Sequence, residues 1–130
     1  MKRARGEGKN GARSIALNIR LDLPGRGRIG PGKIELLRQI RACRSISAAA
    51  RAMNMSYRRA WLLVDDLNGV FAEPIVEKWL GGTSRGGAML TPAGERLVAS
   101  YETLVQRSAE ANRSLLDEML RNVQPRRLAG

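Results

Sequence analysis

The chain has 130 residues, a length that fits one domain or one domain with a protruding element. Hydrophobic residues make up 43% of it, which is enough for a packed core, but aromatic residues are only 4%, so aliphatic side chains must build that core. There is no histidine and only one cysteine, Cys43, so an intrachain disulfide, a cysteine cluster for zinc and histidine-based catalysis are excluded. We therefore expect a binding protein rather than an enzyme, with no catalytic residue, metal or cofactor.

The formal net charge is +11 and the sequence pI is about 11.3, with the basic residues densest near the N-terminus. Lysine and arginine that neutralise phosphates release counterions, so this charge favours a nucleic-acid partner. A charge that only aids solubility and an anionic membrane surface are the alternatives. No stretch approaches the roughly 20 apolar residues of a membrane span, and no apolar run follows the basic start as in a secretory signal. We expect a cytoplasmic protein with no membrane partner.

The first expected elements are a tail, a strand and a helix. Residues 1–14 are rich in Gly, Lys and Arg, which predicts a flexible basic tail. Residues 15–23 alternate apolar and polar side chains, which predicts a half-buried strand; a Pro-Gly turn and a possible short return strand follow it. Whether the first strand extends a later sheet or a dimer surface is left open. Pro31 begins a first helix that ends near residue 44.

Two more helices are expected next. Ser45 and Ser47 are both N-cap candidates for a short, alanine-rich helix over residues 47–53. Asn54 breaks that helix, because Asn tolerates a left-handed backbone better than most residues. Ser56 caps the third helix, whose apolar residues recur at spacings of four, three and four. This apolar face consists of Ala60, Val64, Leu67 and Phe71.

The remaining residues predict a β-hairpin and a long helix. Residues 75–80 and 88–91 form the strands, and the loop 81–87 between them has the glycine content of a hairpin tip. Thr91 caps a helix that runs to about residue 122, and its apolar residues repeat with heptad-like spacing. A small domain does not cover such a seam alone, so we expect two copies to pair through it. The seam consists of Leu97, Tyr101, Leu104, Ser108, Ala111, Leu115 and Met119.

This order of elements predicts a mainly α fold, a winged helix-turn-helix with a long C-terminal dimerisation helix and a short N-terminal strand. The expected domains are the basic tail at 1–14, the DNA-binding domain at 15–91, the dimerisation helix at 92–122 and a short tail at 123–130. The expected partners are double-stranded DNA and a second copy of the chain, bound through residues 92–122.

The third helix is the candidate recognition helix, because it must bury one face and offers the other to the major groove. Arg58 lies opposite the apolar face, so we expect it to reach base edges, where arginine can bridge guanine O6 and N7. Arg59 is better placed to reach a phosphate, and the hairpin offers two further cations. The candidate DNA-binding residues are Ser56, Tyr57, Arg58, Arg59, Trp61, Lys78 and Arg85.

Each of these residues also has a purely structural interpretation. The arginines are also typical solvated helix residues, and Tyr57 and Trp61 are also typical packing residues. Ser56 is first of all a helix cap.

Two other patterns in the sequence do not indicate a site. Asp65 and Asp66 are adjacent and diverge by about 100° on a helix, so they do not form a catalytic carboxylate pair. The glycine-rich loop is not followed by Gly-Lys-Ser/Thr, so it is not a phosphate-binding P-loop.

Four segments of the sequence resemble a known family. The runs SISAAAR at 45–51, MSYRRAW at 55–61, the glycine-rich 81–87 and AMLTPAGE at 88–95 look like the N-terminal DNA-binding domain of the ModE family of molybdate-responsive regulators. That domain is similar to the winged helix-turn-helix of LysR-type regulators. The resemblance covers roughly residues 30–120. It implies a dimeric transcription factor acting on molybdate transport or molybdenum-enzyme genes.

In this resemblance Ser56, Tyr57, Arg58 and Trp61 match the family's recognition-helix segment, and Arg85 falls in its wing. Full family members also carry C-terminal molybdate-binding modules. No segment of this sequence predicts such a module, so we expect no molybdate binding within the chain. The sequence hypothesis is a sequence-specific, ModE-type transcriptional regulator. The alternatives are an architectural DNA-binding protein without sequence preference and an oxyanion-binding protein.

Overall fold

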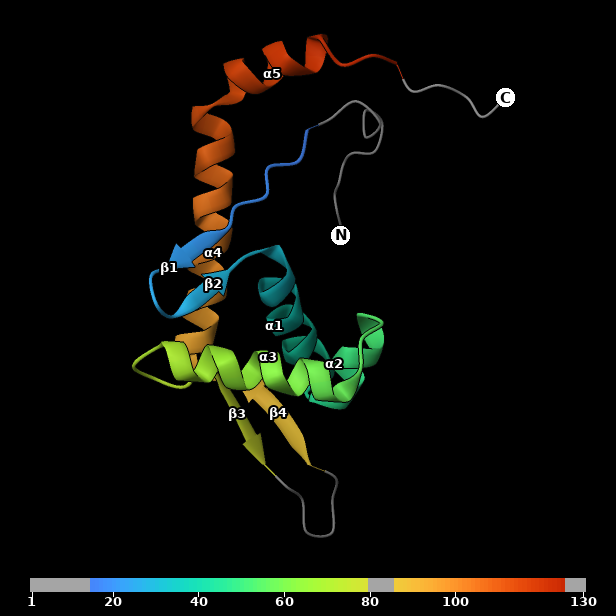
Figure 1. Ribbon diagram of the computed structural model, residues 1–130, viewed down its shortest axis with the longest axis vertical. Coiled ribbons are helices and arrows are strands. Elements are labelled where there is room, and N and C mark those ends of the chain that lie inside the picture. The colour runs from blue at the N-terminus through green and yellow to red at the C-terminus, as the bar shows by residue number, and fades with distance from the viewer. Residues whose placement is uncertain (1–14, 80–85, 126–130) are drawn as a thin grey trace, which may run out of the picture. The chain divides into compact units, whose positions relative to one another are not determined.

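The computed structural model describes residues 15–79 and 86–125, and the expected basic tail, hairpin tip and last residues lie outside these ranges. The described part is mainly helical and contains two small antiparallel sheets (Figure 1). Its elements are β1 (Leu21–Leu23), β2 (Gly27–Ile29), α1 (Pro31–Cys43), α2 (Ile46–Ala52), α3 (Tyr57–Val70), β3 (Val76–Trp79), β4 (Gly87–Leu90), α4 (Pro92–Ala111) and α5 (Arg113–Arg121). None of these helices is long and apolar enough to cross a membrane.

The chain divides into two compact units. The larger unit spans Asn18–Leu104 and holds both sheets, the first three helices and most of α4. The smaller unit consists of the residues before Asn18 and after Leu104, and it includes the end of α4 and all of α5.

Helix caps define the starts of α2 and α3. The expected helix over residues 47–53 is found one residue earlier, at Ile46–Ala52. The Ser45 Oγ accepts a hydrogen bond from the Ala48 N–H at 3.1 Å, so Ser45 rather than Ser47 is the N-cap of α2. The Ser56 Oγ accepts from the Arg59 N–H at 3.1 Å in the same way. Asn54 has the left-handed φ of 57° that its place between the helices requires.

The core of the larger unit is aliphatic, as the composition predicts. Ile34, Leu37 and Ile40 of α1 are completely buried. The expected apolar face of α3 is confirmed for Ala60, Val64 and Leu67, which are also completely buried; Phe71 lies just beyond the helix and is half-buried. No polar or charged side chain is buried within the described ranges.

The expected strand over residues 15–23 is only partly correct. Only Leu21–Leu23 form a strand, which pairs antiparallel with Gly27–Ile29. The return strand is three residues long because Pro31 starts α1 directly after Gly30, so no partner is left for residues 15–20. The β1–β2 pair is a sheet of its own and does not extend β3–β4.

The expected single helix over residues 92–122 is wrong, because the structure contains two helices there. α4 ends at Ala111, and Asn112, with φ −112° and ψ 19°, precedes a separate helix α5. The expected apolar seam is divided accordingly. Tyr101 is buried in the larger unit, where its hydroxyl donates to the carbonyl of Ile19, whereas Leu115 and Met119 on α5 are more than half exposed.

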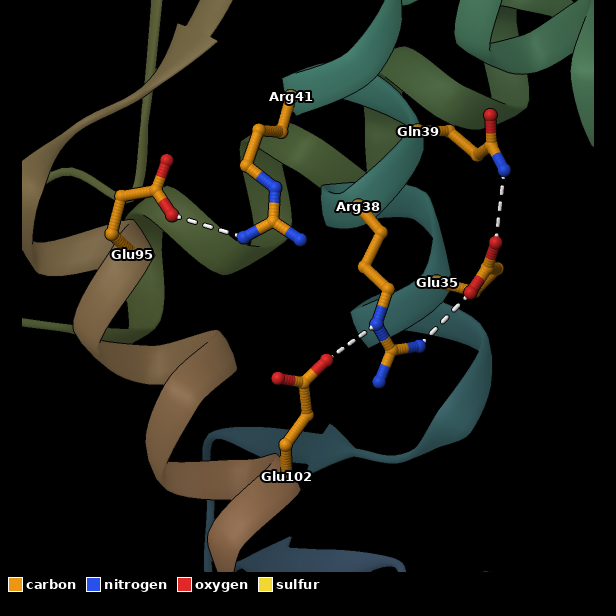
Figure 2. Close-up of polar contacts among 6 residues, drawn as sticks. All are labelled: Glu35, Arg38, Gln39, Arg41, Glu95 and Glu102. Atoms are coloured by element: carbon orange, nitrogen blue, oxygen red, sulfur yellow. Dashed lines mark hydrogen bonds and ion pairs between the residues drawn. The ribbon is translucent and has the colours of Figure 1, made fainter. Parts of the chain in front are cut away.

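Polar side chains join α1 to α4 inside the larger unit (Figure 2). Arg38 Nε donates to Glu102 at 2.7 Å and Arg38 Nη1 donates to Glu35 at 2.9 Å. Arg41 Nη1 donates to Glu95 of α4 at 3.1 Å. Burial lowers the pKa of Arg38, but the hydrogen bonds that Arg38 donates to Glu102 and Glu35 outweigh this effect, so its pKa is raised above its usual value. We call Glu35, Arg38, Gln39, Arg41, Glu95 and Glu102 the α1–α4 polar cluster.

Candidate nucleic-acid interface

α3 has one buried and one exposed face, as the spacing of its apolar residues predicts. Ala60, Val64 and Leu67 point into the core, while Arg58 and Leu62 are exposed. Leu62 is 47% exposed, whereas Leu67 of the same helix is completely buried. The exposed face of α3 is therefore available to a partner.

A shallow hollow of about 480 Å³ runs along this exposed face, and we call it the α3 groove. Arg58 and Arg59 supply its positive charge, whereas Asp65 and Asp66 add negative charge further along the helix. The Asp66 Oδ2 lies 3.3 Å from Lys33 Nζ, and the Asp66 side chain is still 61% exposed. The groove is lined by Ser56, Arg58, Arg59, Leu62, Leu63, Asp65 and Asp66.

A second hollow, of about 470 Å³, lies between α2, the start of α3 and the β3–β4 pair, and we call it the notch. Figure 1 shows these three elements together, with the start of α3 beside α2 and the two strands extending beyond α3. The described lining of the notch carries two cations, Arg51 and Lys78, and no carboxylate. The notch is lined by Ser45, Ile46, Ser47, Arg51, Tyr57, Trp61, Lys78, Trp79, Gly86 and Gly87.

Both cations of the notch are held by neighbouring side chains. Arg51 Nη1 donates to the Ser47 Oγ one helical turn earlier, at 3.0 Å. Lys78 Nζ lies over the ring of Trp61, 4.6 Å from its centroid, which is a cation–π contact. Neither cation forms an ion pair with a described carboxylate. Their positive charge is therefore not neutralised within this part of the chain.

Hydrogen bonds fix β3 and β4 against the helices that border the notch. Asn68 of α3 accepts from the N–H groups of Ile75 (2.8 Å) and Val76 (3.0 Å) and donates to the Val76 carbonyl at 3.0 Å. On the other strand, the Ala88 N–H donates to the carbonyl of Arg44 at 3.1 Å. Arg44 ends α1 with a left-handed φ of 57°, which non-glycine residues adopt infrequently. The position of the strands thus depends on both α1 and α3.

The start of α4 is attached to the same strands. The Thr91 N–H donates to the Ile75 carbonyl at 3.0 Å, and its hydroxyl donates to the Pro74 carbonyl at 2.6 Å. The Thr91 Oγ1 also accepts from the Gly94 N–H at 3.0 Å, which confirms the expected cap. Gly94 is buried directly against the Ile75 carbonyl, with no room for a Cβ.

The structure divides the candidate residues between the two hollows. Ser56, Arg58 and Arg59 line the α3 groove, whereas Tyr57, Trp61 and Lys78 line the notch. Arg85 lies outside the described residues.

The sequence analysis missed Ser47, Arg51 and Trp79 as lining residues of the notch. The only sequence signal for Arg51 is that it follows Ser47 by four residues, the spacing of neighbours on one helix face. Within the described ranges, no group of three or more Cys, Asp or Glu residues is arranged to hold a metal ion.

The chain is similar to several known proteins over most of its own length. It is 40% identical over 90 residues to a transcriptional regulator ModE from Yersinia pestis, covering 69% of this chain and 34% of that protein. It is 36% identical over 88 residues to the DNA-binding transcriptional dual regulator ModE of Escherichia coli, covering 68% and 34%. It is 47% identical over 74 residues to the molybdenum-pterin-binding protein MopB of Rhodobacter capsulatus, covering 57% and 27%.

The chain thus corresponds to about a third of the length of these relatives, or less. No family model matches the sequence. These similarities relate the chain to ModE-type regulators and to molybdenum-pterin-binding proteins, in agreement with the resemblance drawn from its motifs.

Proposed function

We propose that this chain is a ModE-type transcriptional regulator that binds DNA in a sequence-specific way. In this proposal α2 and α3 form a helix-turn-helix, the β3–β4 pair is the wing, and α3 enters the major groove. The observation that carries the proposal is the α3 groove, where Arg58 and Leu62 are exposed on the face opposite the core and Arg59 is exposed beside them. The net charge of +11 and the similarity to proteins named as ModE regulators support it.

The roles within α3 follow from the position of each side chain. Arg58 contacts base edges, because it lies on the exposed face at the start of the helix, where recognition helices meet the groove. Arg59 contacts a phosphate. Leu62 is one turn further along and offers an apolar contact, for example to a thymine methyl group.

Selection of bound sequences from a random DNA pool tests this proposal. We expect a motif, and with it a matched duplex for measuring affinity by fluorescence anisotropy. Arg58→Ala should weaken binding to that duplex by about 1–3 kcal/mol and binding to a scrambled duplex much less. Arg59→Ala is the matched control and should weaken both to a similar extent. Recovery of no motif would contradict sequence-specific reading and favour an architectural DNA-binding protein.

We further propose that two copies pair through residues 92–122, with α5 contributing. Leu115 and Met119 are one turn apart on α5 and 57% and 54% exposed, and no residue of α5 is buried within the chain. Analytical ultracentrifugation should therefore find a dimer, and Leu115→Glu should shift it toward monomer. Asp117→Asn, on another side of α5, is the control and should leave the dimer intact. A wild-type monomer at high micromolar concentration would contradict this pairing.

A second candidate function is the binding of molybdate or another oxyanion, favoured by the 47% identity to a protein named as molybdenum-pterin-binding. Calorimetric titration of molybdate into the chain separates the two functions. Saturable binding would favour this candidate, and repeating the DNA selection with molybdate present would show whether the two activities are coupled. Absence of binding would leave DNA recognition as the function of this chain.

A further inference from the structure

The notch has a composition different from that of the α3 groove, although both border α3. Its described lining has two cations, serine and tyrosine hydroxyls and two tryptophan rings, and it contains no carboxylate. The α3 groove contains two aspartates beside its two arginines. In the described lining, an anion that enters the notch therefore meets two cations and neutral groups and no carboxylate.

The two cations also have donor groups left for a ligand. Arg51 uses Nη1 to hold Ser47, and a guanidinium has five N–H donors. Lys78 lies over the ring face of Trp61, which attracts the positive charge of its ammonium group. The ring has no lone pair to accept all three N–H groups of Lys78, so N–H donors remain for a ligand. The surrounding contacts therefore restrict where these cations lie while leaving donors for the oxygens of an anion.

We propose that the notch binds one phosphodiester group of the DNA backbone, with Arg51 and Lys78 as its two cationic contacts. Trp61 acts as a positioning residue that holds Lys78. This inference rests on the proposed DNA-binding function and adds Arg51, on α2, to the contacting residues. It gives the wing strand β3 and the helix α2 a shared phosphate, next to the groove where α3 reads bases.

The charge and openness of the notch favour a phosphodiester over a buried small-molecule ligand. The aromatic rings that line it, Tyr57, Trp61 and Trp79, are 55%, 37% and 40% exposed, so the site is accessible to a long polymer. Free inorganic phosphate has the same tetrahedral oxygen chemistry, so the experiment must separate the two sources.

The test measures how the affinity of the full chain for DNA depends on salt. The matched and scrambled duplexes are titrated at several KCl concentrations with the wild type, Arg51→Gln and Lys78→Gln. Each variant should weaken binding to both duplexes by the same factor and reduce the slope of log affinity against log salt by about 1. Arg26→Gln removes an exposed cation of the β1–β2 turn, outside both hollows, and should leave the slope unchanged.

The positioning role of Trp61 has its own readout. Trp61→Phe keeps an aromatic face under Lys78 and should retain most of the slope, whereas Trp61→Leu should reduce the slope as Lys78→Gln does. Thermal unfolding of both variants identifies any loss that comes from misfolding. Equal slopes for the two Trp61 variants would overturn the positioning role.

Failure of this inference can be told apart from failure of the proposed function. An unchanged slope for Arg51→Gln and Lys78→Gln, with a preferred motif still present, overturns the phosphodiester site alone. A reduced slope without any preferred motif supports the site and overturns sequence-specific regulation. Inorganic phosphate is also titrated into the DNA-free chain at constant ionic strength. Saturable phosphate binding that Arg51→Gln abolishes, together with an unchanged DNA slope for that variant, would assign the notch to a free oxyanion and overturn the phosphodiester assignment.

Discussion

The α1–α4 polar cluster and the notch both contain two cations, but the two regions use the positive charge differently. In the cluster, Arg38 and Arg41 donate to carboxylates of α4 at 2.7 and 3.1 Å. In the notch, Arg51 is held by a hydroxyl and Lys78 by an aromatic ring, and neither has a carboxylate partner within the described residues. The first pair of cations joins two helices, and the second pair retains its charge for a ligand.

This difference shows why the net charge alone does not locate a binding surface. A cation with a carboxylate partner contributes little to attracting a polyanion, because the pair is nearly neutral at a distance. The comparison predicts that changes in and around the cluster lower stability and leave the salt dependence of DNA binding unchanged. Neutralising Arg51 or Lys78 in the notch should instead reduce the salt dependence and change stability little.

Gly94→Ala should give the largest loss of stability, because the new Cβ collides with the backbone carbonyl of Ile75 where α4 begins. We expect the free energy of unfolding to fall by about 3 kcal/mol, measured by urea denaturation. Gly69→Ala in α3 is the matched control, since a Cβ there meets no atom within 4 Å. That variant should gain about 0.5–1 kcal/mol from the better helix propensity of alanine. Equal stabilities of the two variants would contradict the close packing at Gly94.

Asn68→Ala should give the next largest loss, because it removes one acceptor and one donor that bind the backbone of Ile75 and Val76. The expected decrease is about 2 kcal/mol in the same denaturation experiment. Asn68→Asp keeps the acceptor for both N–H groups and loses only the donor, so its stability should be intermediate. If aspartate is no better than alanine, the two N–H contacts do not anchor β3.

Gly87→Ala changes the notch without removing a charge. A Cβ at Gly87 collides with the ring of Trp79, its cross-strand partner, and this exposed side chain has room to turn away. The stability cost should be about 1 kcal/mol. The clearer readout is fluorescence, because Trp61 and Trp79 are the two tryptophans of the chain and both line the notch. An unchanged emission spectrum would show that Trp79 does not lie over Gly87.

The Arg38–Glu102 pair should give the smallest effect. Both side chains are more than a third exposed, so solvent screens their attraction. A double-mutant cycle with Arg38→Met and Glu102→Gln should give a coupling of about 0.2–1 kcal/mol that decreases at high salt. The slope of DNA affinity against salt should match the wild type in Arg38→Met. A reduced slope would mean that Arg38 contacts DNA and would remove the contrast between the two regions.

The sequence predicts the first three helices well because their ends have local chemical signals. Pro31, Ser45 and Ser56 each set a helix start through the backbone or a cap, and Asn54 accepts the left-handed turn. The break at Asn112 has no comparable signal, since the heptad-like spacing continues through it. The length of the N-terminal strand is overestimated. The alternation of apolar and polar residues over 15–23 indicates a half-buried segment, but it does not show how long the partner strand is.

The candidate site is predicted in part. The exposed face of α3 follows from helical periodicity, so Arg58 and Arg59 are found from the sequence. Arg51 and Trp79 are not, because their place in the notch depends on how α2, α3 and β3 pack together. Periodicity also does not foresee that Arg44 adopts a left-handed backbone and accepts a hydrogen bond from β4.

The direct passage from β4 to α4 limits how the length of the chain can vary. Only Thr91 separates Leu90, the last residue of β4, from Pro92, the first of α4. A single residue inserted between Leu90 and Thr91 displaces the Thr91 contacts with Pro74 and Ile75, and with them the start of α4 and the fit of Gly94 against the Ile75 carbonyl. Insertions and deletions should therefore be poorly tolerated at this junction, so a fusion or a label is better placed elsewhere in the chain.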